Sequence, residues 1–235
     1  MFYYGFDDSS QYLLYLLAVL IVVYAQSRLN GAYQKYRSIA SSSMLSGEQC
    51  AQRILSQSRL SHVRVEVSDG GILSDHYDPR NKVVRLSSEI YYGSSIASLS
   101  VAAHECGHVL QDAHGFVFLR IRDALVPVVN LASRIGWILL VFGLLLFYRS
   151  STLLIIGAAL LGVSLLFQIV TLPVELDASR RALVILRESA MLEEAEIPMA
   201  RAMLRAAAFT YVASVLSTLT QLLRILLLAR GRDRR

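Results

Sequence analysis

The sequence predicts a mainly helical integral membrane protein that also carries a small polar α+β portion. Of its 235 residues, 54% are hydrophobic and only 17% are charged, whereas roughly 25% of the residues in soluble domains are charged. Three stretches contain no charged residue, namely residues 9–27, 150–174 and 206–223. Each is close to the ~20 apolar residues that a transmembrane helix needs.

The first uncharged stretch predicts an N-terminal transmembrane helix over residues 1–27. Its apolar run, QYLLYLLAVLIVVYAQ, has neither a preceding basic region nor the small-residue cleavage site of a signal peptide. Arg28, Lys35 and Arg37 follow it. Because basic residues favour the cytoplasmic side, we expect the polar portion that comes next to lie in the cytosol.

Residues 28–124 are expected to form the first part of this polar domain. Between Gly47 and Leu60, the residues Ala51, Ile54 and Leu55 recur at helical intervals, which predicts a surface helix with a buried stripe. Val63, Val65 and Val67 then alternate with polar residues, as in a strand. The segment DPRN separates GILSDHY from KVVRLS and is typical of a turn. These patterns predict a small antiparallel sheet with a short β-hairpin.

Two apolar segments predict a transmembrane helical hairpin over residues 125–172. The first covers about 125–148, and the tight connection RSST joins it to the second. Residues 173–235 are then expected to complete the polar domain and to end in an apolar helix. Whether this last helix spans the membrane stays open, because spanning would place the Arg-rich tail outside, and because Arg224 lies within it.

Residues 104–108 read HECGH and match the H-E-x-x-H pattern of zinc proteases. The preceding segment is rich in serine, which favours a packed soluble helix over an intramembrane one. On a helix, His104 and His108 lie on one face and can bind one metal ion. Glu105 lies about 60° from His108 and suits a general base, whereas Cys106 lies about 160° from both histidines and is a poor ligand.

A hydrolytic zinc site needs a third protein ligand. His114 has nearly the metzincin spacing, but residue 111 is Gln rather than the glycine that would turn the chain. Glu175 is the first acid after the uncharged stretch, and the helical hairpin would return it to the level of the histidines. An acid at that depth needs a partner, which is either the metal or one of Arg180 and Arg181.

Several further polar residues are candidates for supporting roles. Asp112 and Gln111 lie one turn beyond the second histidine and could hold a ligand in place. The donors that could stabilise an oxyanion are His76, Tyr77 and Tyr211, each of which also has a plain structural explanation.

The segments AAHECGHVLQDA, TLPVELDAS, GILSDHYDPRNKVVRLS and AAAFTYVAS resemble the YugP-like neutral zinc metallopeptidases of bacterial membranes, over about residues 3–228. The resemblance implies a gluzincin-type site like that of HtpX-like proteases, in the bacterial cytoplasmic membrane. It implies Zn²⁺ ligation by His104, His108 and Glu175, with Glu105 as general base. One departure is Ser179, which stands where the HtpX-like pattern has Asp, so carboxylate support would be weaker or come from Asp112.

The resulting hypothesis is a membrane-bound zinc endopeptidase that hydrolyses protein or peptide substrates with a zinc-activated water. The rival readings are an intramembrane protease, a non-proteolytic membrane scaffold with a structural or vestigial zinc site, and a protein acting through a partner. The net charge of +5 is interpreted as membrane orientation and lipid contact rather than nucleic-acid binding. Cys50 and Cys106 are expected to be reduced thiols. Substrate and oligomeric state stay open.

Overall fold

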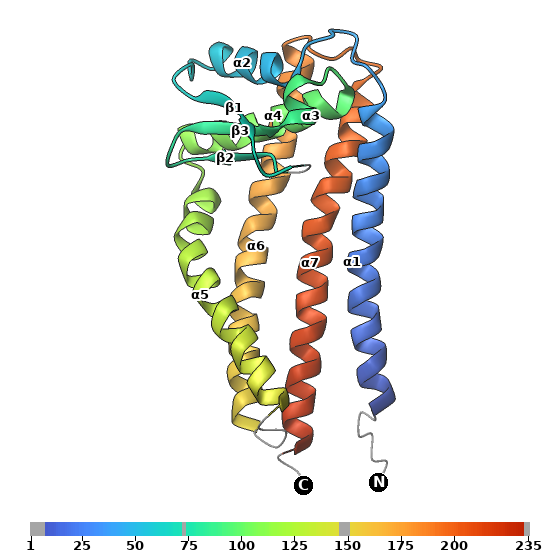
Figure 1. The fold of residues 1–235 in the computed structure, drawn as a ribbon, viewed down its shortest axis with the longest axis vertical. Helices are drawn as coiled ribbons and strands as arrows, with labels where there is room; N and C mark the ends of the chain where they lie inside the picture. The colour runs from blue at the N-terminus through green and yellow to red at the C-terminus, as the bar shows by residue number, and fades with distance from the viewer. Residues whose placement is uncertain (1–7, 72–73, 146–150, 233–235) are drawn as a thin grey trace. The chain divides into compact units, whose positions relative to one another are not determined.

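The computed structural model describes residues 8–71, 74–145 and 151–232. Within them the fold is mainly helical, with one small sheet (Figure 1). The helices are α1 (Asp8–Arg37), α2 (Gly47–Gln57), α3 (Ser88–Tyr92), α4 (Ile96–Ala113), α5 (Val117–Leu145), α6 (Ser151–Glu188) and α7 (Ile197–Arg232). The strands are β1 (Arg64–Ser68), β2 (His76–Asp78) and β3 (Val83–Ser87).

The chain divides into two compact units. The helical unit comprises residues 1–26, 121–172 and 210–235, and the mixed unit comprises residues 27–120 and 173–209. The mixed unit holds the sheet and the short helices, together with one end of α1, α6 and α7.

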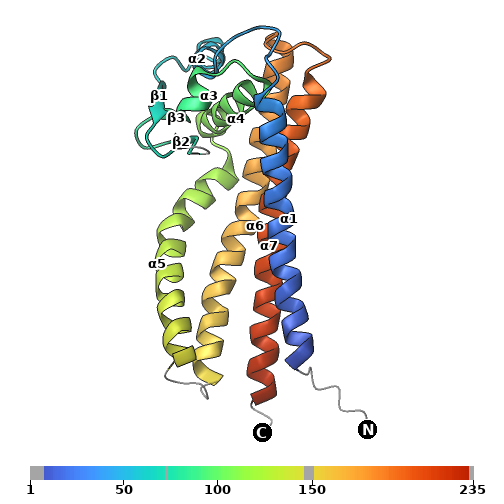
Figure 2. The same cartoon turned by 45° about the vertical axis from the view of Figure 1, so that its right-hand side comes forward.

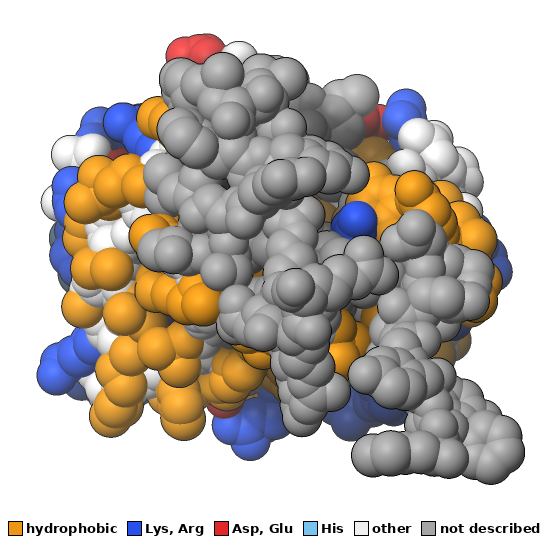
Figure 3. Space-filling model, turned by 90° about the horizontal axis from the view of Figure 1, so that it is seen from below, with side chains coloured by type: hydrophobic (Ala, Val, Ile, Leu, Met, Phe, Trp, Pro, Cys, Tyr) orange, Lys and Arg blue, Asp and Glu red, His pale blue; other side chains and the backbone are white. Residues whose placement is uncertain are grey.

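Three described helical segments are long and apolar enough to cross a membrane: Tyr12–Arg37, Ile155–Glu188 and Ile197–Leu227. Large hydrophobic side chains are exposed along them, including Leu13 on α1, which is 65% exposed, and Ile155 on α6, which is 53% exposed. Hydrophobic side chains also lie at the surface in the view of Figure 3. Such exposure is unfavourable in water, and it suits helices that face lipid.

These segments can be compared with the predicted spans. The first and third predicted spans overlap two of them, Tyr12–Arg37 and Ile155–Glu188. The second, at about 125–148, corresponds to α5, which is not among the three, and its expected end lies outside the described residues. The sequence left open whether the C-terminal helix spans the membrane. Its segment Ile197–Leu227 is long and apolar enough to do so. Within the helical unit, the guanidinium of Arg224 lies 5.3 Å from the ring centre of Tyr15, a cation–π contact that helps to accommodate its charge.

The helix predicted between Gly47 and Leu60 is α2. It begins with a capping box, in which the Ser46 hydroxyl accepts from the Gln49 amide and the Gln49 side chain accepts from the Ser46 amide. It ends three residues earlier than expected, because the chain turns at Ser58 and Arg59 takes a positive φ of 59°. Its predicted apolar stripe is buried as expected.

The sheet has the strand order β1-β3-β2. Strands β2 and β3 form the predicted antiparallel hairpin, with His76 opposite Arg85. Strand β1 instead runs parallel to β3, with Arg64 opposite Val83, so the expectation of an all-antiparallel sheet was wrong. The reason is that β2 lies at the far edge, so the chain reverses direction twice between the two strands that pair.

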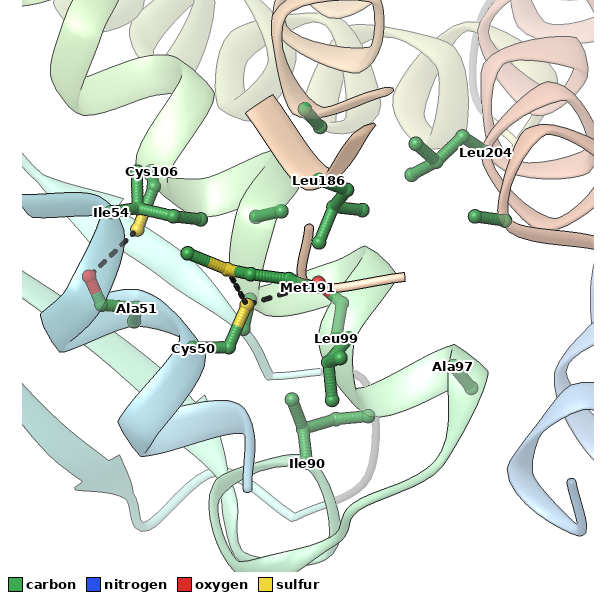
Figure 4. Packing of buried hydrophobic residues seen from close by; sticks show 14 of the residues in the cluster. Cys50, Ala51, Ile54, Ile90, Ala97, Leu99, Cys106, Leu186, Met191 and Leu204 are labelled. Carbon is green, nitrogen blue, oxygen red and sulfur yellow. Dashed lines mark hydrogen bonds between the residues drawn. The ribbon is translucent and has the colours of Figure 1, made fainter. Parts of the chain in front are cut away.

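The core of the mixed unit packs α2 and α4 against the region where α6 ends (Figure 4). Cys50 of α2 lies with its sulfur 3.7 Å from that of Met191. The thiol of Cys106 on α4 lies 3.8 Å from the carbonyl oxygen of Ala51. Both cysteines are free, as expected, and both are buried. Cys106 therefore points into the core between α2 and α4.

Candidate metal centre

His104 and His108 lie one turn apart on α4, which runs through the core of the mixed unit. The helix begins after Ser95, whose hydroxyl accepts a hydrogen bond from the Ser98 amide and so caps the first turn. The two imidazole rings have their centres 4.8 Å apart and stand at 83° to each other. This geometry allows one nitrogen from each ring to approach a common point.

Glu175 of α6 lies at that point. Its Oε2 atom is 3.2 Å from Nε2 of His104 and 3.8 Å from Nε2 of His108. The three residues form a group whose ligand atoms all lie within 4.8 Å of one another. Ligands about 2.0–2.1 Å from a tetrahedral zinc ion are about 3.3 Å apart, so this donor set fits Zn²⁺.

A glycine in the motif allows α4 and α6 to approach so closely. A Cβ atom built on Gly107 would lie 2.7 Å from the carbonyl oxygen of Ala178 and 3.1 Å from its Cα. These are backbone atoms that cannot swing aside. Gly107 therefore lets the two helix backbones meet beside Glu175, in the stretch of α6 that follows Pro173. Figure 2 shows α4 beside this end of α6.

The outer nitrogen of His108 is held by a buried glutamine. Gln111 receives the Nδ1–H of His108 on its Oε1 atom, at 3.0 Å. Its Nε2 donates to the carbonyl oxygen of Val174 at 2.7 Å and to the carboxylate of Asp177 at 3.1 Å. Because both neighbours of Gln111 Nε2 are acceptors, this atom is the amide nitrogen and Oε1 is the acceptor for His108. The proton of His108 therefore lies on Nδ1, and its Nε2 carries the lone pair that faces Glu175.

The outer nitrogen of His104 is contacted by a serine. The hydroxyl of Ser179, one helical turn after Glu175, lies 3.2 Å from Nδ1 of His104. The two histidines are thus both contacted by side chains from α4 or α6, and α6 also carries the carboxylate of the group. Burial lowers the pKa of His104, but the hydrogen bond to Glu175 and the charges of Glu105 and Glu175 raise it more, so the net shift is upward.

Glu105 is buried beside the group and accepts a hydrogen bond from the sheet. The peptide N–H of Tyr77, in edge strand β2, donates to its carboxylate. The pKa of Glu105 is raised to about 7, mainly by burial and also by the carboxylates of Glu175 and Asp75, which together outweigh the lowering by His104 and by the Tyr77 hydrogen bond. A carboxylate therefore lies within electrostatic range of the group without belonging to it.

Comparison with known proteins agrees with this site. A family profile described as "Putative neutral zinc metallopeptidase" matches residues 11–230. The chain belongs to this family. It is also 40% identical over 219 residues to the "Putative membrane protease YugP" of Bacillus subtilis (strain 168), which covers 93% of this chain and 96% of that protein. No solved structure matches the chain.

The relative's name and the three apolar helices support a membrane protein. In this metallopeptidase family member, the ligand set proposed from the sequence comes together in one unit. His114 does not join it, because it caps the end of α4 and its Nδ1 lies 2.7 Å from the carbonyl oxygen of Leu110. The sequence offered Arg180 and Arg181 as alternative partners of Glu175. In the structure both arginines form salt bridges with Asp177.

The remaining predicted residues lie in other settings. Asp112 accepts from the hydroxyl of Tyr77 at 2.7 Å and pairs with Lys82 at 2.5 Å, so its carboxylate ties α4 to the hairpin. His76 is exposed, and its Nδ1 lies 2.8 Å from the carbonyl oxygen of Ser74. Tyr211 belongs to the helical unit, so it is not part of the unit that holds the group.

Sequence reasoning missed the carboxylate of Asp177. Asp177 of α6 reaches His108 through Gln111, which hydrogen-bonds to both. One sequence signal could have pointed to Asp177. Gln111 follows His108 closely in the sequence, and Asp177 follows Glu175 closely. If the two ligand segments meet, the residues that follow them meet as well.

Proposed function

We propose that this family member is a membrane-bound zinc metalloendopeptidase that hydrolyses protein or peptide substrates. His104, His108 and Glu175 bind the metal, and Glu105 acts as the general base. The family supports a zinc peptidase, and the His, His and Glu group supports the ligand set. An ion held there would polarise a carbonyl and acidify a water molecule, which is the chemistry that zinc supplies to peptidases.

The chain's own residues prepare the site for this reaction. Gln111 keeps the proton of His108 on Nδ1, so that Nε2 carries the lone pair that a metal ligand needs. Ser179 holds the ring of His104 from its other side. Both side chains are themselves buried, and the ligand rings are therefore oriented before a metal arrives.

Glu105 takes a proton from the attacking water and passes it to the leaving amine. The hydrogen bond from the Tyr77 peptide fixes its carboxylate in place. Because Tyr77 lies in an edge strand, an extended substrate could lie along the outer edge of β2, next to Glu105.

The observation that carries the proposal is that three ligand donors, and not four, lie beside the carboxylate of Glu105 among the described residues. The group found among the described residues has three members, whereas structural zinc sites use four protein ligands. A scaffold with structural zinc also has no use for a buried glutamate that is held next to the ligands without joining them. The geometry therefore favours the peptidase over the scaffold.

The test uses full-length protein purified in detergent. The Glu105→Gln variant keeps the size of the side chain and a carbonyl oxygen for the Tyr77 amide. We expect it to retain zinc, measured by metal analysis, and to lose casein cleavage by about a hundredfold or more, because general-base catalysis contributes roughly 10²–10⁴-fold. Glu193→Gln, at an exposed position, is the control and should cleave normally.

Unchanged cleavage by Glu105→Gln would reject the general-base role. Wild-type protein that carries one zinc ion and cleaves no peptide would favour the scaffold instead.

We also infer that the site faces the cytoplasm, because Arg28, Lys35 and Arg37 follow the first apolar segment. Both native cysteines are buried, so a cysteine introduced by Arg80→Cys, at an exposed turn, offers one accessible label. An impermeant maleimide should label it only after the cells are permeabilised. Labelling of intact spheroplasts would place the site outside.

A further inference from the structure

A groove in the mixed unit runs between α6 and α7. It has a volume of about 430 Å³ and is lined by residues of α6 from Leu176 to Glu188 and of α7 from Ile197 to Ala208. We call it the arginine groove, because Arg180, Arg187, Arg201 and Arg205 line it. Glu188 is the one acid among its described lining residues, so the groove carries a surplus of positive charge.

Two of these arginines have their charge already satisfied. Arg180 pairs with Asp177 at 2.7 Å, and Arg187 pairs with Glu194 at 2.8 Å. Arg201 and Arg205 are exposed and have no hydrogen-bond or ion-pair partner among the described residues. They lie four residues apart on α7, which places both guanidinium groups on the same helix face. Two adjacent, unpaired cations form a site for an anion.

The floor of the groove is apolar. Leu183 and Leu204 line it from opposite helices, and Leu176 lines it at the end nearest to Glu175 along α6. Leu176 is 49% exposed, so water contacts an apolar surface that a hydrocarbon chain would cover. A matching ligand therefore has both an anionic group and an apolar part.

The sequence places this groove at the end of two apolar helix segments. On α6, the uncharged stretch 150–174 ends just before Leu176. On α7, the stretch 206–223 begins directly after Arg205. The stretch 206–223 falls within a segment that is long and apolar enough to cross a membrane, Ile197–Leu227, and most of the stretch 150–174 falls within another, Ile155–Glu188. Residues that directly flank such stretches lie at the level of the lipid headgroups.

We propose that the arginine groove binds an anionic phospholipid, with the phosphate between Arg201 and Arg205 and an acyl chain over the leucines. This goes beyond the peptidase function and does not depend on it. A lipid is preferred over an acidic peptide because anionic headgroups are concentrated at this depth, and because the groove joins charge to an apolar floor. Ser179, which contacts His104, also lines the groove, so the bound lipid lies next to the metal centre.

The experiment measures lipid binding to the full chain in detergent by native mass spectrometry and by the thermal unfolding midpoint. The probes are phosphatidylglycerol, phosphatidylcholine with the same acyl chains, and glycerol phosphate without chains. The variant is Arg201→Gln with Arg205→Gln. The control is Arg53→Gln with Arg80→Gln, which removes the same charge from exposed positions of the mixed unit outside the groove.

We expect phosphatidylglycerol to bind and to raise the midpoint more than phosphatidylcholine does, and glycerol phosphate to do neither. The groove variant should bind phosphatidylglycerol about tenfold more weakly, because each basic residue near an anionic headgroup contributes to binding. The control variant should bind normally, and circular dichroism of both variants should match the wild type.

Three results would overturn the proposal. The first is equal binding of the two lipids by the wild type. The second is an equal loss of phosphatidylglycerol in the groove and control variants, which would mean unspecific attraction by net charge. The third concerns an acidic, leucine-containing peptide. If its binding depends on Arg201 and Arg205 while phosphatidylglycerol binding does not, the occupant is a peptide.

Discussion

Gly107 of α4 meets the backbone of Ala178 of α6 so closely that a Cβ atom at residue 107 would lie 2.7 Å from the Ala178 carbonyl oxygen. This contact stands between the segment that carries His108 and the segment that carries Glu175. Gly107 directly precedes His108, and Ala178 follows Glu175 by three residues. The distance between the helices at this contact therefore decides whether the carboxylate reaches the histidines.

The contact makes Gly107→Ala a sensitive test. The added methyl group has to push α6 away from α4, because its neighbours are backbone atoms. We expect the free energy of unfolding to fall by about 1–3 kcal/mol, as for overpacked cores, and zinc to bind more weakly. Thermal unfolding and chelator competition measure the two effects.

Gly31→Ala on α1 is a matched control, since a Cβ atom there meets nothing within 4 Å. It should leave zinc binding unchanged and stabilise the helix slightly, because alanine has the higher helix propensity. Equal effects of the two substitutions would show that Gly107 has no special packing role.

Gln111→Met tests the hydrogen bonds around His108. The substitution keeps most of the side-chain volume, but it removes the acceptor for His108 Nδ1–H and the donor to Val174 and Asp177. We expect zinc affinity to fall about 10–100-fold, as is usual when the partner of a ligand histidine is lost. An unchanged affinity would mean that the histidine needs no such support.

Glu175→Ala tests the third ligand. It removes the carboxylate that lies 3.2 Å from His104 and 3.8 Å from His108, and two ligands rarely hold zinc tightly. We expect the purified variant to contain little zinc by metal analysis, while His114→Ala keeps the full amount. The opposite pattern, with zinc lost only in His114→Ala, would restore the metzincin-like alternative.

The thiols offer a test of the core. Burial raises the pKa of Cys50 to about 12 and that of Cys106 well above its usual range. Only the thiolate reacts with iodoacetamide, so neither cysteine should be alkylated in the folded protein at pH 8, and both should react in denaturant. Mass spectrometry counts the adducts. Rapid labelling of the native protein would show that α2 and α4 separate readily.

The same shift has a defined effect on stability. Because the folded-state pKa of Cys50 is raised, its contribution is complete below the unfolded value of about 8.5 and is lost as pH rises toward 12. The unfolding midpoint of Cys50→Ala should accordingly fall less steeply above pH 9 than that of the wild type. Parallel curves would contradict the shift.

Local patterns in the sequence predicted the elements well. Helical spacing located α2, and a turn signal located the β2–β3 hairpin. The parallel pairing of β1 with β3 was not predictable in this way. Alternation shows that a segment is a strand, but it carries no information about which neighbour that strand will choose or in which direction.

The site shows the same division between sequence and structure. The sequence by itself determined the spacing of His104 and His108 and singled out Glu175 as a candidate, because helical periodicity and an acid after a long uncharged stretch are local features. Only the tertiary structure decided that Gln111 links His108 to Asp177, that Ser179 contacts His104, and that Gly107 lets α4 and α6 meet. These relationships join residues more than 60 positions apart, and packing between helices sets their distances.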